Sequence, residues 1–163
     1  MKSRRRAVVG IVVGLSGCAS YYTAPDGVAT AKLAFVTDMR PVMVQRFEDA
    51  SCSESKNGVR LAYIDPTFGS KHGGPVLVEA DKELIFTVSK KQLAASVMGG
   101  STCTITMRFV PKAGEDYEVH FLQTPGGCSE GIFRVLKDTQ GVASRIPVTT
   151  ASKLEKTCLT AFD

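Results

Sequence analysis

Short runs of β-branched and aromatic residues, each bounded by turn-forming residues, recur along most of the chain. Such runs are typical of β-strands, and eight of them in one chain favour a sandwich or a barrel. They occupy residues 31–37, 42–48, 59–64, 76–80, 84–89, 103–110, 117–123 and 131–138. One segment, 89–98, has a helical pattern that would give a turn or two at most. We therefore predict an all-β fold, a single antiparallel β-sandwich of about 7–8 strands with an immunoglobulin-like or transthyretin-like arrangement.

The first seventeen residues differ in composition from the rest of the chain. A basic head of Lys2, Arg4, Arg5 and Arg6 is followed by an apolar stretch, residues 7–15, and then by small residues up to Cys18. The apolar stretch is about half the ~20 residues that a helix needs to cross a bilayer. The pattern therefore predicts a secretory signal peptide over residues 1–17 instead of a stable membrane span.

Residues 15–18 read LSGC and resemble the lipobox of bacterial lipoproteins, in which Leu, a small residue and Gly or Ala precede a Cys. The resemblance implies that Cys18 begins the mature chain and carries a diacyl group on sulfur, with palmitate among its acyl chains. Each buried methylene contributes about 0.8 kcal/mol, so two or three such chains anchor a protein stably. Residue 19 is Ala and not the Asp that favours inner-membrane retention in enterobacterial lipoproteins. The resemblance thus implies an outer-membrane lipoprotein on the periplasmic side, and an ordinary cleavable signal with an incidental cysteine is the alternative.

Removal of the signal peptide changes the charge of the chain. The whole sequence has 20 Lys and Arg against 16 Asp and Glu, but four of the basic residues and none of the acidic ones precede Cys18. The remaining 16 basic and 16 acidic residues make the mature chain formally neutral. A neutral chain without a basic cluster does not favour nucleic-acid binding. The partners we expect are the membrane, through the N-terminal lipid, and an envelope protein.

The part after Cys18 is long enough for one domain with a proper core. Residues 18–30 start with the acylated cysteine and continue as a small, polar stretch broken by Pro25 and Gly27, which predicts a tether. Fully extended, it would reach ~35–40 Å at about 3.3 Å per residue. We therefore expect a β-sandwich domain over residues 31–163 that is held clear of the lipid headgroups.

Four cysteines remain after the signal, namely Cys52, Cys103, Cys128 and Cys158. An exported chain meets an oxidising compartment, so the even count predicts two disulfides, with three possible pairings. Their wide spacing excludes the short-range motifs of zinc or redox sites. If the strands near 103, 117 and 131 form a meander, Cys103 and Cys128 lie at the same end of it. We therefore favour Cys103 with Cys128, which leaves Cys52 to hold the tail at Cys158.

The stretch from residue 103 to 123 predicts a hairpin through the turn PKAGED. Alternation places Cys103 and Phe109 on the inner face, and Arg108, Glu118 and His120 on a common outer surface. The hairpin sequence FVPKAGEDYEV, followed by a Cys, is similar to one in small disulfide-bonded proteobacterial lipoproteins. That group has no assigned activity, so the resemblance implies no catalytic residue.

Candidate catalytic residues are few. The sequence has two histidines, His72 and His120, and no Gly-x-Ser-x-Gly motif accompanies them. The carboxylates of Glu115, Asp116 and Glu118 could act as acid and base or bind calcium, but a solvated charged turn is the favoured interpretation. We therefore predict a protein that is not an enzyme and that has no cofactor and no metal site.

The loop PTFGSKHGGP, residues 66–75, is the candidate binding element. Its glycines permit close backbone approach, Lys71 and His72 could meet an anion, and Phe68 could anchor a protein contact. One hypothesis is a non-enzymatic binding or structural module of the cell envelope. The alternative is a periplasmic ligand binder, or an inhibitor of a wall-degrading enzyme that presents this loop to a cleft.

Overall fold

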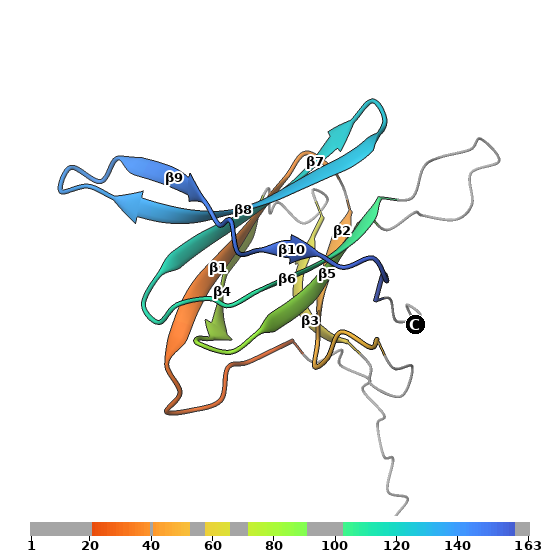
Figure 1. Ribbon diagram of the computed structural model, residues 1–163. Helices are drawn as coiled ribbons and strands as arrows, with labels where there is room; N and C mark the ends of the chain where they lie inside the picture. The colour runs from red at the N-terminus through yellow and green to blue at the C-terminus, as the bar shows by residue number, and fades with distance from the viewer. Residues whose placement is uncertain (1–20, 40, 53–57, 66–71, 91–102, 159–163) are drawn as a thin grey trace, which may run out of the picture.

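The part of the chain that the structure describes is all-β, with ten strands in two five-stranded sheets (Figure 1). The computed structural model describes residues 21–39, 41–52, 58–65, 72–90 and 103–158, and no helix occurs within these ranges. The strands are β1 (Thr30–Thr37), β2 (Val42–Phe47), β3 (Val59–Ile64), β4 (His72–Glu79), β5 (Leu84–Lys90), β6 (Thr104–Phe109), β7 (Asp116–Thr124), β8 (Gly127–Lys137), β9 (Ala143–Pro147) and β10 (Ser152–Lys153).

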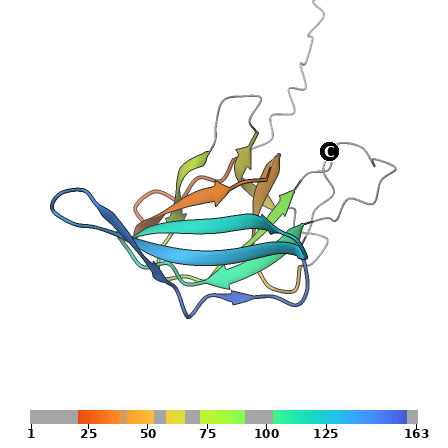
Figure 2. The same cartoon turned by 90° about the horizontal axis from the view of Figure 1, so that it is seen from above.

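The first sheet has the order β4-β1-β7-β8-β9, and the second has the order β10-β6-β5-β2-β3. Neighbouring strands are antiparallel except β1 and β7, which run parallel from Lys32 opposite Asp116 to Thr37 opposite Phe121. The ends of β8 and β9 project beyond the rest of the first sheet as a two-stranded ribbon, seen at the left of Figures 1 and 2.

One core lies between the two sheets, because alternate residues of each strand point inward. Phe35 of β1 contacts Phe86 of β5 edge to face, with 6.3 Å between ring centroids, and Phe109 of β6 contacts Tyr117 of β7 at 5.2 Å. Both pairs join one sheet to the other. Other buried members of this core include Leu33, Val42, Val44, Ile64, Val78, Val88, Ile105, Val119, Phe121 and Ile132.

The structure confirms strands in all eight predicted runs, but the predicted number of about 7–8 strands is wrong. The two additional strands are β9 and β10. All five residues of β9 are exposed, so its sequence lacks the apolar alternation by which half-buried strands are recognised. β10 has only two residues, opposite Arg108 and Met107 of β6.

The predicted hairpin between residues 103 and 123 is also wrong. β6 pairs with β5 and β10 in the second sheet, whereas β7 pairs with β1 and β8 in the first, so the turn PKAGED crosses from one sheet to the other. The alternation within each strand is as predicted. Because the strands lie in different sheets, however, Arg108 lies on one outer surface, and Glu118 and His120 lie on the opposite one.

Both favoured disulfides are confirmed. Cys103 and Cys128 join the start of β6 to the start of β8, and they therefore link the two sheets. Cys52 and Cys158 tie the chain after β2 to the C-terminal segment across a separation of 106 residues. If disulfides stabilise by restricting chain entropy, closing a loop of that length raises the free energy of the unfolded chain by about 5 kcal/mol.

Two predicted segments lie mostly outside the described residues. Of the helical candidate 89–98, Ser89 and Lys90 belong to β5 and the remainder is not described. Of the loop 66–75, the last four residues belong to β4 and residues 66–71 are not described.

Candidate functional site

The domain has two opposite ends, which we name by the residues nearest to each. At the Tyr21 end, the amides of Ala80 and Gly114 donate to the carbonyls of Ala29 and Thr30, at 2.8 Å each. At the Cys128 end lie the disulfide to Cys103 and the turn between β7 and β8. Figure 1 shows the first end at the bottom of the molecule and the β7–β8 turn at the top.

The segment 21–29, predicted as part of a tether, is held to the domain at both of its ends, through Tyr21 and Tyr22 and through Ala29. The Tyr22 amide donates to the Arg60 carbonyl at 2.7 Å, and Tyr21 forms a parallel bridge with Arg60. The segment then crosses from the β3 side to β1, in red to orange in Figure 1, with Gly27 at a positive φ of 76° in the turn. Tyr21, the third residue after Cys18, is therefore already in contact with the domain.

Two arginine side chains hold the tyrosine pair. The Arg60 guanidinium lies 5.4 Å from the centroid of the Tyr21 ring, and that of Arg46 lies 4.9 Å from the Tyr22 ring. Each such cation–π contact contributes about 0.5–1 kcal/mol at an exposed site. Tyr22 also packs against the main core. The adjacent tyrosines at 21 and 22 are the signal, overlooked in the sequence, that this stretch is not a simple linker.

An open groove of about 610 Å³ lies between residues 21–30 and the edge strands β3 and β4. Its walls include Tyr21, Tyr22, Val28, Leu61, Pro75 and Leu77. Pro75 is the only residue of the predicted binding loop among the described lining residues. Tyr21 is 54% exposed, Leu77 49% and Val28 36%, so the rim presents aromatic and aliphatic surface to its surroundings. The groove thus has largely apolar walls, and the Arg60 guanidinium lies next to the Tyr21 ring at its rim.

The outer face of the first sheet carries a cluster of charged side chains. Arg145 of β9 donates two hydrogen bonds to the carboxylate of Glu118, at 2.7 and 3.1 Å, and His120 Nε2 lies 2.8 Å from the same carboxylate. The Arg145 hydrogen bond, followed by that of His120, lowers the pKa of Glu118 below its usual value. Phe133 packs on the His120 ring at 4.8 Å. The half-buried Glu118 carboxylate is thus held ionised by Arg145, which is largely solvated, and by His120.

Arg145 takes the place in this cluster that the sequence assigned to Arg108. Because Arg145 lies in β9, a strand that the sequence did not predict, its proximity to Glu118 could not be foreseen. Arg108 instead hydrogen-bonds to Ser152 at 3.0 Å on the other sheet.

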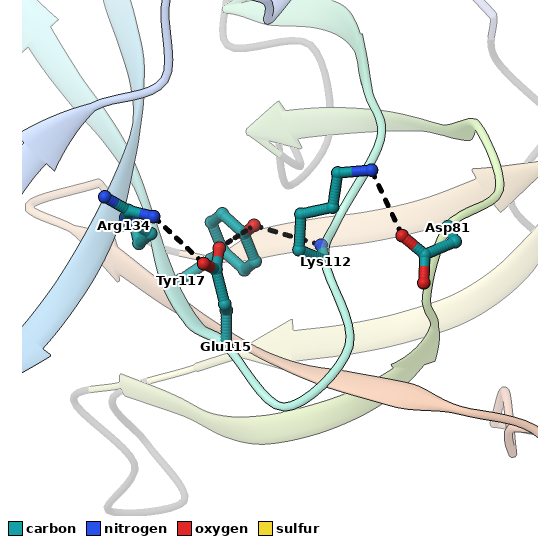
Figure 3. A network of polar contacts seen from close by, with 5 residues as sticks. All are labelled: Asp81, Lys112, Glu115, Tyr117 and Arg134. Carbon is teal, nitrogen blue, oxygen red and sulfur yellow. Dashed lines mark hydrogen bonds and ion pairs between the residues drawn. The ribbon is translucent and has the colours of Figure 1, made fainter.

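A second polar network holds the crossover between the sheets (Figure 3). The Tyr117 hydroxyl accepts from the Lys112 amide at 3.0 Å and donates to Glu115 at 2.5 Å, and Arg134 donates to the same carboxylate at 2.9 Å. Burial, and then the Glu115 hydrogen bond, raises the pKa of Tyr117 to about 12. The Lys112 ammonium also reaches Asp81 at 3.1 Å. The charged residues near Glu115 therefore have a structural role in fixing the crossover.

The remaining predicted site residues are placed as follows. Cys18, Phe68 and Lys71 lie outside the described residues. His72 begins β4 opposite Val36, toward the Cys128 end. Within the described ranges, no group of three or more His, Cys, Asp or Glu side chains could hold a metal ion. The same part of the chain contains no helix with the length and apolar character of a membrane span.

Comparison of the chain with protein-family models, with curated proteins and with solved structures found no match.

Proposed function

We propose that this chain is an outer-membrane lipoprotein, anchored through Cys18, whose domain is a non-enzymatic binding module of the cell envelope on the periplasmic side. We further propose that its two sheets form a β-sandwich of immunoglobulin-like or transthyretin-like class. The observation that carries the proposal is the sequence LSGC at residues 15–18, placed directly before a domain that packs from Tyr21 onward.

The two disulfides support export of the chain. Disulfides form and persist in oxidising compartments, and the four cysteines after residue 18 are all paired. The pairs also leave the mature domain without a thiol for nucleophilic catalysis, which supports a binding role over an enzymatic one.

The places where β3 ends and β4 begins support a binding role for the Cys128 end, which would face away from the membrane. β3 ends at Ile64 and β4 begins at His72, so the predicted binding loop leaves and re-enters the fold at that end. The disulfide to Cys103 makes the same end rigid. Loops on a rigid sheet often carry binding residues, so an envelope protein would meet the molecule there.

Mass spectrometry of the protein purified from membranes tests the anchor. We expect a mature chain that begins at Cys18 with acyl groups attached, and a Cys18→Ser variant that stays unacylated. Crosslinking in cells followed by affinity capture, with that variant as control, should retrieve a specific envelope protein. An unacylated mature chain would contradict the proposal, as would capture of nothing beyond abundant porins.

A second candidate function is inhibition of a wall-degrading enzyme, and it is favoured because β3 ends at Ile64 and β4 begins at His72, both at the end opposite Tyr21. Soluble protein from residue 19 onward should then slow the lysis of cell walls by lysozyme. Deletion of residues 69–71, which leaves β4 intact, should abolish the effect. Equal lysis with and without the protein at high micromolar concentration would eliminate this candidate.

A further inference from the structure

We infer that the Tyr21 end of the domain rests on the phospholipid surface, with Tyr21, Val28 and Leu77 in the headgroup layer. The inference rests on the proposed acylation of Cys18, and it adds an orientation and a second contact with the membrane. In this inference, the rim of the groove contacts a lipid surface and not a protein.

The first argument is the covalent reach of the chain. Tyr21 is the third residue after Cys18, and it is held to the domain through the bridge to Arg60. At ~3.3–3.6 Å per residue, this connection spans at most about 11 Å. Each headgroup layer is roughly 5–7 Å thick, since a bilayer of ~40–45 Å has a hydrocarbon core of ~30 Å. Tyr21 must therefore lie in the headgroup layer or directly above it.

The second argument is the chemistry of the rim. Tyrosine is enriched where a membrane meets water, because its ring is apolar and its hydroxyl can stay hydrated. Tyr21, Val28 and Leu77 line one groove and are each at least one-third exposed. The guanidinium of Arg60, next to the Tyr21 ring, supplies a cation for lipid phosphates. The apolar rim, which also carries Asp26, thus lies next to the Arg60 guanidinium at the place where the acyl chains must enter the bilayer.

The third argument concerns the opposite end of the domain. Among the described residues next to the β7–β8 turn, Leu122 is 37% exposed and has no exposed tyrosine beside it. The segment 21–29 is hydrogen-bonded to the domain at Tyr22 and at Ala29, so it does not act as an extended spacer. The acyl chains supply the affinity, and the short connection with the rim sets the orientation.

The absence of tryptophan from the sequence allows a direct test. A Tyr21→Trp variant of the acylated protein has a single tryptophan, and Leu122→Trp is the matched control at the other end. Both are reconstituted into vesicles of phosphatidylethanolamine and phosphatidylglycerol that contain lipids brominated near the headgroup. We expect a blue-shifted emission and several-fold stronger quenching for Tyr21→Trp than for Leu122→Trp. Val28→Trp, in place of Tyr21→Trp, should behave in the same way and covers the case in which residue 21 does not tolerate the change.

The outcomes separate the inference from the proposed function. If mass spectrometry finds the acyl groups but position 21, position 28 and position 122 are quenched equally, the orientation is overturned and the anchor stands. If the mature protein is unacylated and does not float with the vesicles, both are overturned. Stronger quenching at 21 and 28 than at 122 supports the orientation.

Discussion

The outer faces of the two sheets are built from similar alternating strands, yet one is covered and the other is open. On the second sheet, Phe47 and Ile85 point outward and are buried with Cys158, in a small cluster that also contacts Leu154 and Cys52. On the first sheet, the outward side chains of Lys32, Lys137 and Arg145 are 59%, 63% and 46% exposed and form ion pairs.

The cover on the second sheet is the C-terminal segment. β10 pairs with β6, the Cys158 amide donates to the Thr106 hydroxyl at 2.9 Å, and Thr106 lies 2.8 Å from the Thr87 hydroxyl. The disulfide to Cys52 holds the segment in place. The outer face of a sheet is therefore buried where a segment distant in the sequence packs over it, as the C-terminal segment does on the second sheet, and is exposed where no such segment packs. Four predictions test this comparison.

Removal of the disulfide between Cys52 and Cys158 should have the largest effect on stability. We expect the double variant Cys52→Ser and Cys158→Ser to lower the free energy of unfolding by about 2–5 kcal/mol, because the unfolded chain regains the freedom that the bridge removes. Urea denaturation measures the loss. Hydrogen exchange should show fast local exchange of the amide of residue 158, whereas the amides of β7 and β8 should lose no more protection than the fall in global stability accounts for. An unchanged unfolding curve would mean that the disulfide does not hold the C-terminal segment on the second sheet.

A smaller loss is expected from Thr106→Val. The change removes the hydroxyl that accepts from the Cys158 amide and that pairs with Thr87, both in a buried place. Leaving a buried donor without its partner costs about 1–3 kcal/mol. Thr124→Val, on a half-buried residue of the first sheet, is the matched control and should change stability by less than about 0.5 kcal/mol. Equal effects of the two substitutions would contradict the comparison.

On the open sheet, Glu118→Gln should lower stability by about 1 kcal/mol, because the Arg145 partner of this half-buried carboxylate is solvated and such ion pairs contribute little. The folded-state pKa of Glu118 is lowered from its ordinary 4.5, so its ionisation stabilises the fold above that pH. The stabilisation is lost as pH falls through the lowered folded-state pKa. Thermal melts should therefore separate the two proteins at pH 7 and converge in acid, and high salt should narrow the difference at pH 7. A stability difference between the two proteins that grows in acid would contradict the prediction that ionised Glu118 stabilises the fold.

The smallest effect is expected from Lys32→Ala. Its ammonium lies 3.9 Å from Asp116, and the side chain is 59% exposed. Solvated pairs of this kind change stability by within about 0.5 kcal/mol. Urea denaturation beside the Glu118→Gln variant checks the ranking. A loss from Lys32→Ala as large as that from Thr106→Val would show that the open face contributes to stability as much as the covered one.

Much of the fold could be predicted from the sequence because strand alternation and cysteine count are local signals. The eight runs, the inward residues of β6 and β7, and the two disulfides were all recognised from them. The premise for the disulfide pairing, a meander that includes β6, was nevertheless wrong. Cys103 and Cys128 still meet, because the crossover brings the starts of β6 and β8 to the same end of the molecule.

By itself, the sequence determined which residues of each strand face inward, because a period of two residues leaves no choice within a strand. It also determined the lipobox resemblance at Cys18, which is a matter of consecutive residues. Only the tertiary structure decided that β6 and β7 lie in different sheets, that Arg145 meets Glu118, and that residues 21–29 pack on the domain. The physical reason is that alternation specifies the face of a residue and not its partner strand. Partners are chosen by the packing of segments far apart in the chain.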